Sequence, residues 1–328
     1  MSELQKFIFE GLPVRGAIVQ LTDVWQETLA RHRQSHPQDG QSSGLFLPAV
    51  CELVGEMSAA AVLLSTTIKF DGTLILQIQG DGPLKLAVAE VQPGLGVRAT
   101  AKTSGTIPPL GGIDALCNVH GQGKCAITLD PQNRKPGQQP YQGVVPLNDA
   151  QGRSFVHLSQ VIEGYMQQSE QLPTHIILAA DEHRAAGLLI QHLPGAGENN
   201  IGAGAELDAD GGSANEHFNR LAILAQSLQR EELLTLSVHD ILHRLFWQEK
   251  VRLFGGETPR FQCTCSRERV ANMLRGLGQD EVKSIVSEQG AVEVNCDFCG
   301  AVYHFDAVDA DKLFVPDNQQ PPVSDALQ

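Results

Sequence analysis

The sequence predicts an α+β fold in which an N-terminal domain with a largely antiparallel sheet precedes a helical linker and a small four-cysteine domain. Short β-rich runs, bounded by turn dipeptides, alternate with helical patterns in residues 1–194. A glycine-rich stretch and two amphipathic patterns occupy residues 195–255. Four of the seven cysteines then fall within residues 256–315 as two tight pairs. We therefore expect three regions, followed by a disordered tail at 316–328.

The strands expected in residues 1–194 come in neighbouring pairs. Asp-Gly, Gly-Pro and other turn signals separate the members of each pair, which favours antiparallel hairpins. Two longer segments carry apolar residues at near-helical spacing and are expected to be helices. The expected strands are 74–79 with 84–88, 125–129 with 141–145, and 174–179 with 186–191; the expected helices are 45–68 and 155–170.

The linker, 195–255, has two parts. Residues 195–212 contain six glycines and no aromatic residue, which is typical of a flexible segment. Residues 214–250 carry two apolar stripes at helical spacing, and Ser237 is placed to cap the second helix, with Asp240 three residues on. The linker has too few apolar residues for a core of its own, so we expect these stripes to need a partner surface. The stripes consist of Phe218, Leu221, Leu224, Ala225 and Leu228, and of Val238, Ile241, Leu242, Leu245 and Phe246.

Charge and composition exclude several classes of function. The formal net charge is −14, which argues against nucleic acid as a partner, because binding phosphates requires an excess of Lys and Arg. No run of eighteen apolar residues occurs, so no membrane span is expected. The first sixteen residues lack the features of a signal peptide, which favours a cytoplasmic protein.

The two cysteine pairs have the spacing of a metal site. Cys263-x-Cys265 and Cys296-x-x-Cys299 supply four thiolates, which is the tetrahedral donor set that zinc prefers. About sixty residues with few apolar groups fold weakly alone, so a bound zinc ion would contribute much of the folding free energy. In a cytoplasmic protein the remaining cysteines, Cys51, Cys117 and Cys125, are interpreted as buried or incidental thiols without a role.

Ligand spacing alone leaves the purpose of this site open. A static structural zinc site is one interpretation. A redox switch is another, because a Cys-x-Cys pair closes only a small strained ring and strained disulfides are the labile kind. Arg267 and Arg269 could offset the negative charge of the thiolates. A thiol–disulfide oxidoreductase using Cys296 and Cys299 is a further rival, although the glycine after Cys299 argues against the helix that such enzymes place there.

His239 and His243 resemble part of a zinc-protease motif, with Asp240 after the first histidine where that motif has glutamate. A helix would place both imidazoles on one face. Aspartate is shorter than the usual general base, and no third ligand is evident downstream. The pair is therefore interpreted as two histidines at the edge of the solvent rather than as a catalytic centre.

Taken together, the motifs resemble the bacterial redox-regulated holdase chaperones of the heat-shock protein thirty-three family. The runs at 263–269 (CTCSRER) and 296–300 (CDFCG) carry the resemblance. Further segments follow in the order in which the family has them, and the resemblance covers nearly the whole chain. They are 14–16 (VRG), 69–72 (KFDG), 79–83 (QGDGP), 141–145 (YQGVV), 169–174 (SEQLPT) and 231–236 (EELLTL).

The resemblance implies a function as well as a fold. It implies a non-enzymatic, ATP-independent holdase for unfolding proteins under oxidative stress, with no nucleic-acid or membrane partner. The reduced form would be inactive and would bind one zinc ion per chain through Cys263, Cys265, Cys296 and Cys299. Oxidation would form the disulfides Cys263–Cys265 and Cys296–Cys299, release zinc, unfold the linker and yield an active homodimer. Static zinc-binding regulators and oxidoreductases remain the alternatives.

Overall fold

The structure, a computed structural model, describes residues 1–35, 47–68, 70–134, 137–194 and 214–315. The chain forms two compact units, one of Met1–Ala30 with Gln38–Gln262 and one of Arg31–Pro37 with Cys263–Gln328. The fold is α+β with antiparallel sheets, as predicted. The glycine-rich part of the linker and the expected tail lie outside the described residues.

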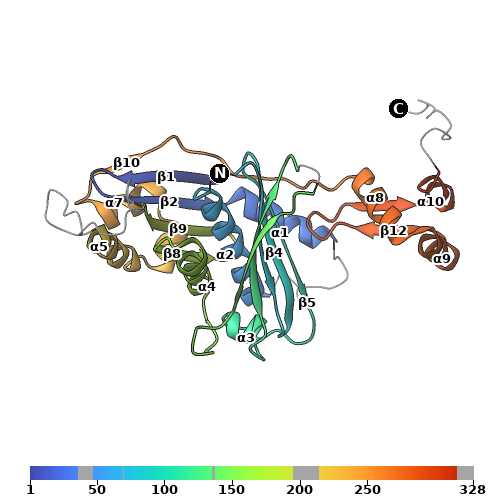
Figure 1. Cartoon of the computed structure of the whole chain (residues 1–328), viewed down its shortest axis with the longest axis horizontal. Coiled ribbons are helices and arrows are strands. Elements are labelled where there is room, and N and C mark those ends of the chain that lie inside the picture. The colour runs from blue at the N-terminus through green and yellow to red at the C-terminus, as the bar shows by residue number, and fades with distance from the viewer. Residues whose placement is uncertain (36–46, 69, 135–136, 195–213, 316–328) are drawn as a thin grey trace. The chain divides into compact units, whose positions relative to one another are not determined.

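The larger unit contains a five-stranded antiparallel sheet in the order β10-β1-β2-β9-β8 (Figure 1). The predicted pairing of the last two strands is confirmed, and Ile176 lies opposite Leu189. Strands β1 and β2 were not predicted. The bounds are β1 Glu3–Phe9, β2 Val14–Leu21, β8 Thr174–Ala180, β9 Ala185–His192 and β10 Val251–Leu253.

A second sheet of six strands has the order β11-β5-β4-β3-β6-β7. The two predicted hairpins of this region are confirmed, and only the short β11 pairs in parallel, with β5. The sequence grouped residues 256–262 with the four cysteines, whereas β11 extends this sheet of the larger unit. The bounds are β3 Gly72–Gln79, β4 Leu84–Gln92, β5 Gly96–Thr103, β6 Lys124–Pro131, β7 Tyr141–Pro146 and β11 Arg260–Phe261.

Helix α2, Pro48–Ser65, contacts strands of both sheets and supplies the centre of the core (Figure 1). Most of its residues are buried, because Ala, Val and Leu occupy nearly its whole circumference. It is long and apolar enough to span a membrane by length and composition, yet 78% of that stretch is buried inside the fold. This matches a core helix. The remaining helices here are α3 Ile113–Cys117, α4 Leu158–Tyr165, which a π-turn, Met166–Glu170, extends, and α1 Asp23–Ser35, whose residues from Arg31 on are grouped with the smaller unit.

Three linker helices cover the other face of the five-stranded sheet (Figure 1). They are α5 Ala214–Gln226, α6 Arg230–Thr235 and α7 Val238–Phe246. The partner surface that the apolar stripes required is therefore the strands β1, β2, β8 and β9. The Ser237 hydroxyl accepts a hydrogen bond from the Asp240 amide at 3.1 Å, so the predicted cap of α7 is confirmed.

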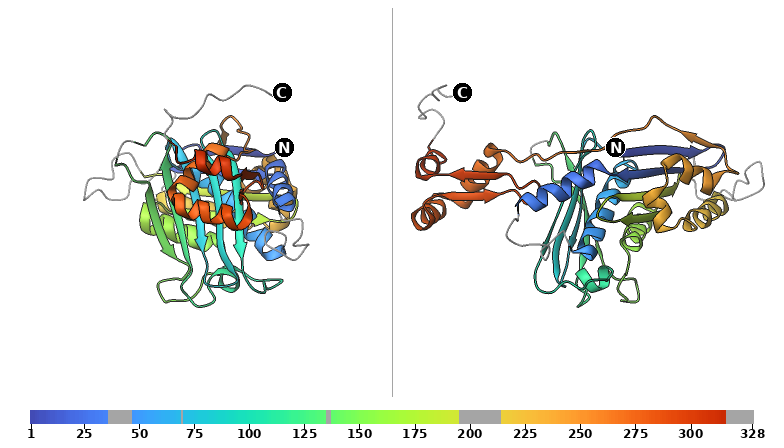
Figure 2. Two further views of the ribbon diagram at one scale, coloured as in Figure 1. Left: turned by 90° about the vertical axis from the view of Figure 1, so that its right-hand side faces the viewer. Right: turned by 180° about the vertical axis from the view of Figure 1, so that it is seen from behind.

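The smaller unit surrounds a two-stranded hairpin with three helices (Figure 2). Ser266 caps the first helix by accepting from the Arg269 amide, and Gly290 ends the second in the left-handed conformation. Met273 and Leu277 lie on the first helix, and both side chains are about half exposed. The bounds are α8 Arg267–Leu277, α9 Gln279–Gln289, β12 Val292–Asn295, β13 Val302–Phe305 and α10 Ala307–Lys312.

Candidate metal centre

Two turns of the smaller unit present the four clustered cysteines. Cys263 and Cys265 lie in the extended segment that enters α8, and Cys296 and Cys299 lie in the tight turn between β12 and β13. The Gly300 amide donates to the Cys296 carbonyl at 2.8 Å, and Gly300 has a positive φ of 69°, which suits glycine. This turn directs both of its thiols to the same side of the hairpin.

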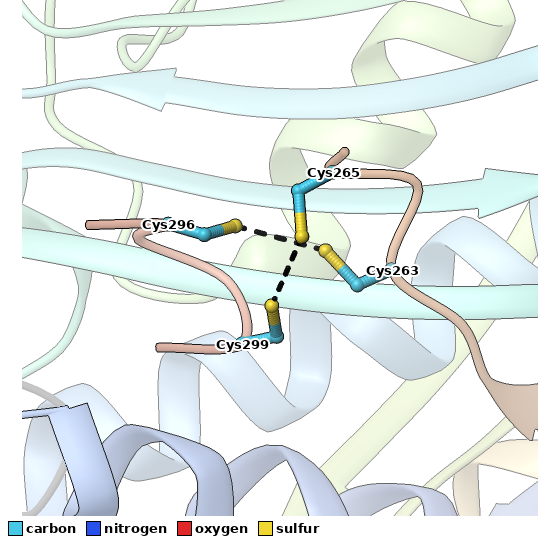
Figure 3. Close-up of side chains that lie close together, drawn as sticks. All are labelled: Cys263, Cys265, Cys296 and Cys299. Atoms are coloured by element: carbon cyan, nitrogen blue, oxygen red, sulfur yellow. Dashed lines mark hydrogen bonds between the residues drawn. The ribbon is translucent and has the colours of Figure 1, made fainter. Parts of the chain in front are cut away.

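The four sulfur atoms converge on one point (Figure 3). All four lie within 4.8 Å of one another, with 3.7 Å between the sulfurs of Cys263 and Cys296 and 3.3 Å between those of Cys265 and Cys299. Zinc–sulfur bonds of about 2.3 Å in a tetrahedron place sulfurs roughly 3.8 Å apart. The arrangement therefore fits a closed four-thiolate zinc site with little adjustment.

The protonation of these thiols also points to a cation. The hydrogen bond with Cys263, together with burial, raises the pKa of Cys296 above its ordinary value. Burial raises the pKa of Cys299 to about 11. Without a cation, Cys296 and Cys299 thus hold their protons. A zinc ion would supply the missing positive charge, and a thiol that coordinates it loses its proton.

The side chains next to the sulfurs are polar or aromatic. The Tyr303 hydroxyl, on β13, hydrogen-bonds the Cys265 sulfur, and this contact raises the pKa of Tyr303 to about 12. Arg267 donates to the His304 carbonyl at 2.8 Å and to Asp309 at 2.6 Å, and its guanidinium lies 4.2 Å from the centre of the Phe305 ring. These contacts make Arg267 a structural link across the unit. Arg269 is exposed on α8.

The core of the smaller unit is small. The buried side chains are mostly single aliphatic groups, and Phe305 is the one large aromatic among them. Such a core contributes little free energy, so the unit depends on additional cross-links. The core residues are Val270, Ala271, Leu274, Val282, Val292, Phe305, Ala310 and Leu313.

The three other cysteines lie elsewhere, in the larger unit. Cys51, Cys117 and Cys125 are all buried, as the sequence suggested. Burial raises the pKa values of Cys117 and Cys125 to about 12, which keeps both thiols protonated and unreactive at neutral pH. His239 and His243 are exposed on α7, and their rings face each other at 6.4 Å.

Sequence reasoning missed the side chains that hold the linker on the sheet. The Gln20 amide, on β2, donates to the carbonyls of Leu233 at 3.1 Å and Leu236 at 2.8 Å. Arg230, on α6, pairs with Glu52 of α2 and donates to the Ala180 carbonyl. These contacts join residues that are far apart in the sequence, so no local motif signals them.

Comparison with known proteins gives a consistent result. The family model described as Hsp33 protein matches residues 2–306. A 33 kDa chaperonin of Methylobacillus flagellatus is 43% identical over 97% of this chain and 96% of its own length. Another, of Chromobacterium violaceum, is 44% identical over 95% of this chain and 93% of its own.

A crystal structure of the 33 kDa chaperonin (heat shock protein 33 homolog) of Thermotoga maritima has the same fold. Its TM-score is 0.70 at 21% identity, and the match covers 95% of this chain and 97% of that one. The four converging thiols thus belong to a chain whose relatives match it almost end to end. The protein is a member of the Hsp33 family of chaperones.

Proposed function

We propose that this chaperone is an ATP-independent holdase that a zinc-dependent redox switch turns on. In the reduced protein, Cys263, Cys265, Cys296 and Cys299 would hold one zinc ion. Oxidation would link Cys263 to Cys265 and Cys296 to Cys299. The observation that carries the proposal is the convergence of four thiols in a unit with a minimal core, in a chain whose linker covers an apolar sheet face.

The oxidation step balances as follows. Two zinc-bound thiolates pass two electrons to one molecule of hydrogen peroxide, which takes up two protons from solvent and is reduced to two molecules of water as one disulfide forms. Two such steps consume all four sulfurs, and the resulting disulfides are poor zinc ligands. The unit then loses a metal contribution of roughly 10–16 kcal/mol in apparent binding free energy, so we expect it to unfold.

The apolar surface that would receive clients is the face beneath the linker helices. Phe7, Phe9 and Ile18 are buried against Phe246 and Leu245 of α7. If the linker detached, this face would expose a contiguous apolar patch of the kind that binds other proteins. We infer that unfolded or partly unfolded polypeptides bind there, and that the active species is a homodimer.

The chain itself offers a route from the switch to the linker. Residues 247–262 connect α7 to Cys263, and they run along the edges of both sheets of the larger unit through the short strands β10 and β11. The contacts that hold this segment are spread along its length. The Phe254 amide donates to the Lys6 carbonyl, Leu4 and Glu257 exchange two backbone bonds, and an exposed ion pair joins Lys6 to Glu257. Further along, the Arg260 and Gln262 amides donate to the carbonyls of Leu95 and Val97. Strands of two or three residues open easily. Unfolding beyond Cys263 would therefore loosen this segment first and the linker next.

In this proposal residues 1–194 form the chaperone domain, 195–255 the linker and 263–315 the switch, and residues 256–262 join the linker to the switch. The protein would act in the cytoplasm, without enzymatic turnover and without nucleic acid or membrane as a partner. An oxidoreductase role for Cys296 and Cys299 is disfavoured, because Gly300 and β13, rather than a helix, follow the pair.

Metal analysis and client aggregation test the proposal together. Reduced protein should contain one zinc per chain and leave the aggregation of an unfolding client unchanged. After peroxide treatment, zinc should be free and aggregation should be suppressed. A protein in which all four cysteines are replaced by serine should lose the zinc ion that the wild-type protein keeps through dialysis. The same zinc content in that variant and in the wild type after dialysis, or equal protection by reduced and oxidised protein, would overturn the assignment.

A further inference from the structure

Helix α7 of the linker presents two histidines on its outer face. His239 and His243 lie one helical turn apart, both are exposed, and their rings are nearly parallel, with 6.4 Å between centroids and 12° between planes. Within the described residues, no ion pair or hydrogen bond is found for either imidazole. Two imidazoles on neighbouring turns are thus open to an external ligand.

The surroundings leave this pair open to solvent. The carboxylate of Asp240, which lies between the histidines in sequence, accepts from the Ser237 hydroxyl at 2.6 Å and so belongs to the helix cap. The opposite face of α7 is buried, with Ile241 and Leu245 among its core residues. A ligand on the outer face would therefore leave the packing of the linker on the sheet undisturbed.

Spacing and chemistry select a metal ion. Residues at i and i+4 share one face of a helix, and imidazole is a preferred ligand of zinc and of the other late first-row divalent ions. We propose that His239 and His243 bind one divalent transition-metal ion, zinc in the cell, with water completing the coordination. Both ligands come from one turn of α7, so the site exists only while this helix is folded.

This dependence gives the site a consequence for the linker. An ion that binds the folded helix and not the unfolded chain stabilises the fold in proportion to its free concentration. The inference rests here on the proposed function, in which oxidation of the four cysteines would release zinc beside this same chain. Zinc that rebinds at His239 and His243 would hold α7 on the sheet and delay activation.

A titration of reduced, full-length protein that already holds one zinc per chain tests the site itself. Zinc sulfate should bind as a second equivalent in the wild-type protein. His243→Gln keeps a good helix former but removes one ligand, and its second equivalent should bind at least roughly tenfold more weakly. His183→Gln, which removes an exposed histidine outside the linker, is the matched control and should bind like the wild type.

Hydrogen exchange on the same samples tests the coupling to folding. Added zinc should slow exchange of the α7 amides in the wild-type protein and in His183→Gln, but not in His243→Gln. Equal affinity of His243→Gln and wild type, or binding without slower exchange in α7, would overturn the proposal. These measurements are made without oxidation. A negative result would therefore count against the histidine site and not against the redox switch, and a failed redox switch would not change the zinc titration.

Discussion

The ring of Phe246 on α7 meets the ring of Phe9 on β1 edge to face, with 4.9 Å between centroids and 86° between planes. Phe7 completes this aromatic cluster at 6.3 Å from Phe246. All three side chains are almost fully buried. The contact fastens the end of the linker to the sheet face that we infer to bind clients, so the linker and a client would compete for the same surface.

Replacing Phe246 should weaken the binding of the linker to the sheet and so leave the surface to clients. Phe246→Ala removes a buried aromatic side chain, which typically costs about 3–5 kcal/mol. The reduced, zinc-bound variant should therefore release its linker and suppress client aggregation without oxidation. Trp247→Ala is the matched control, because this neighbouring side chain is 68% exposed and should leave the protein inactive when reduced. Equal behaviour of the two variants would contradict the proposed client surface.

Glu56, on α2, should make the stability of the larger unit depend on pH. Burial raises the pKa of Glu56 to about 8, the charge of Glu52 adds to this, and Arg230 opposes it. Glutamate in an unfolded chain has a pKa of about 4.3, so between about pH 4.3 and pH 8 the folded state keeps a proton on Glu56 that the unfolded state has lost. Its stability should fall as the pH rises through this window.

The Glu56→Gln variant tests this sign. Glutamine cannot lose a proton, so thermal denaturation between about pH 5 and pH 8 should show a flatter decline than in the wild-type protein. The variant should also be the more stable of the two at pH 8. Glu182→Gln, at an exposed carboxylate, should keep the wild-type slope. A slope that is equally steep in Glu56→Gln would rule out this carboxyl as the cause.

Tyr303 should slow the oxidation of the switch. Its hydroxyl hydrogen-bonds the Cys265 sulfur, and a donated hydrogen bond draws electron density away from a thiolate. Tyr303→Phe should keep one zinc per chain yet release it severalfold faster when peroxide is added, as followed with a zinc-binding dye. Tyr141→Phe, in the larger unit, is the control. A Tyr303→Phe protein that releases zinc at the wild-type rate would exclude this role.

The four-cysteine cluster could be predicted from the sequence because each pair of cysteines lies within a motif of three or four residues. Two short motifs each place two thiols within four residues of chain, one in an extended segment and the other in a tight turn. The strand pairs predicted at 74–88 and 174–191 depend in the same way on adjacent runs and turn residues. Such patterns are set by neighbours in the chain, and local reasoning recovers them.

The partner of the linker could not be predicted in this way. The apolar stripes of residues 214–250 indicated that the linker packs on another surface. That surface could not be identified, because it is formed by β1 and β2 together with β8 and β9, which are far apart in the sequence. In β2, Val14–Leu21, buried side chains occur on both faces, so the strand shows no alternation. The same holds for the hydrogen bonds of the linker. Gln20 and its acceptor Leu236 are 216 positions apart in the sequence, and Arg230 is 178 positions from Glu52 and 50 from Ala180.

The disulfide connectivity is open to a sharp test, because the reduced sulfurs lie close in a different pairing. The short sulfur contacts join Cys263 to Cys296 and Cys265 to Cys299. We nevertheless expect Cys263–Cys265 and Cys296–Cys299 after oxidation, since sequence neighbours meet most often once the unit unfolds. Peptide mapping after peroxide treatment under mildly unfolding conditions measures this. Mainly cross-pair bridges, or bridges to Cys51, would contradict an unfolded switch.

The central claim is that oxidation detaches the linker and thereby exposes the holdase surface. Limited proteolysis and client aggregation, measured on the same reduced and oxidised samples, test it most directly. The account predicts that cleavage moves into residues 195–260 on oxidation while 1–190 stays intact, and that protection of the client appears in step. An oxidised protein that resists the protease like the reduced one, yet still holds clients, would contradict it.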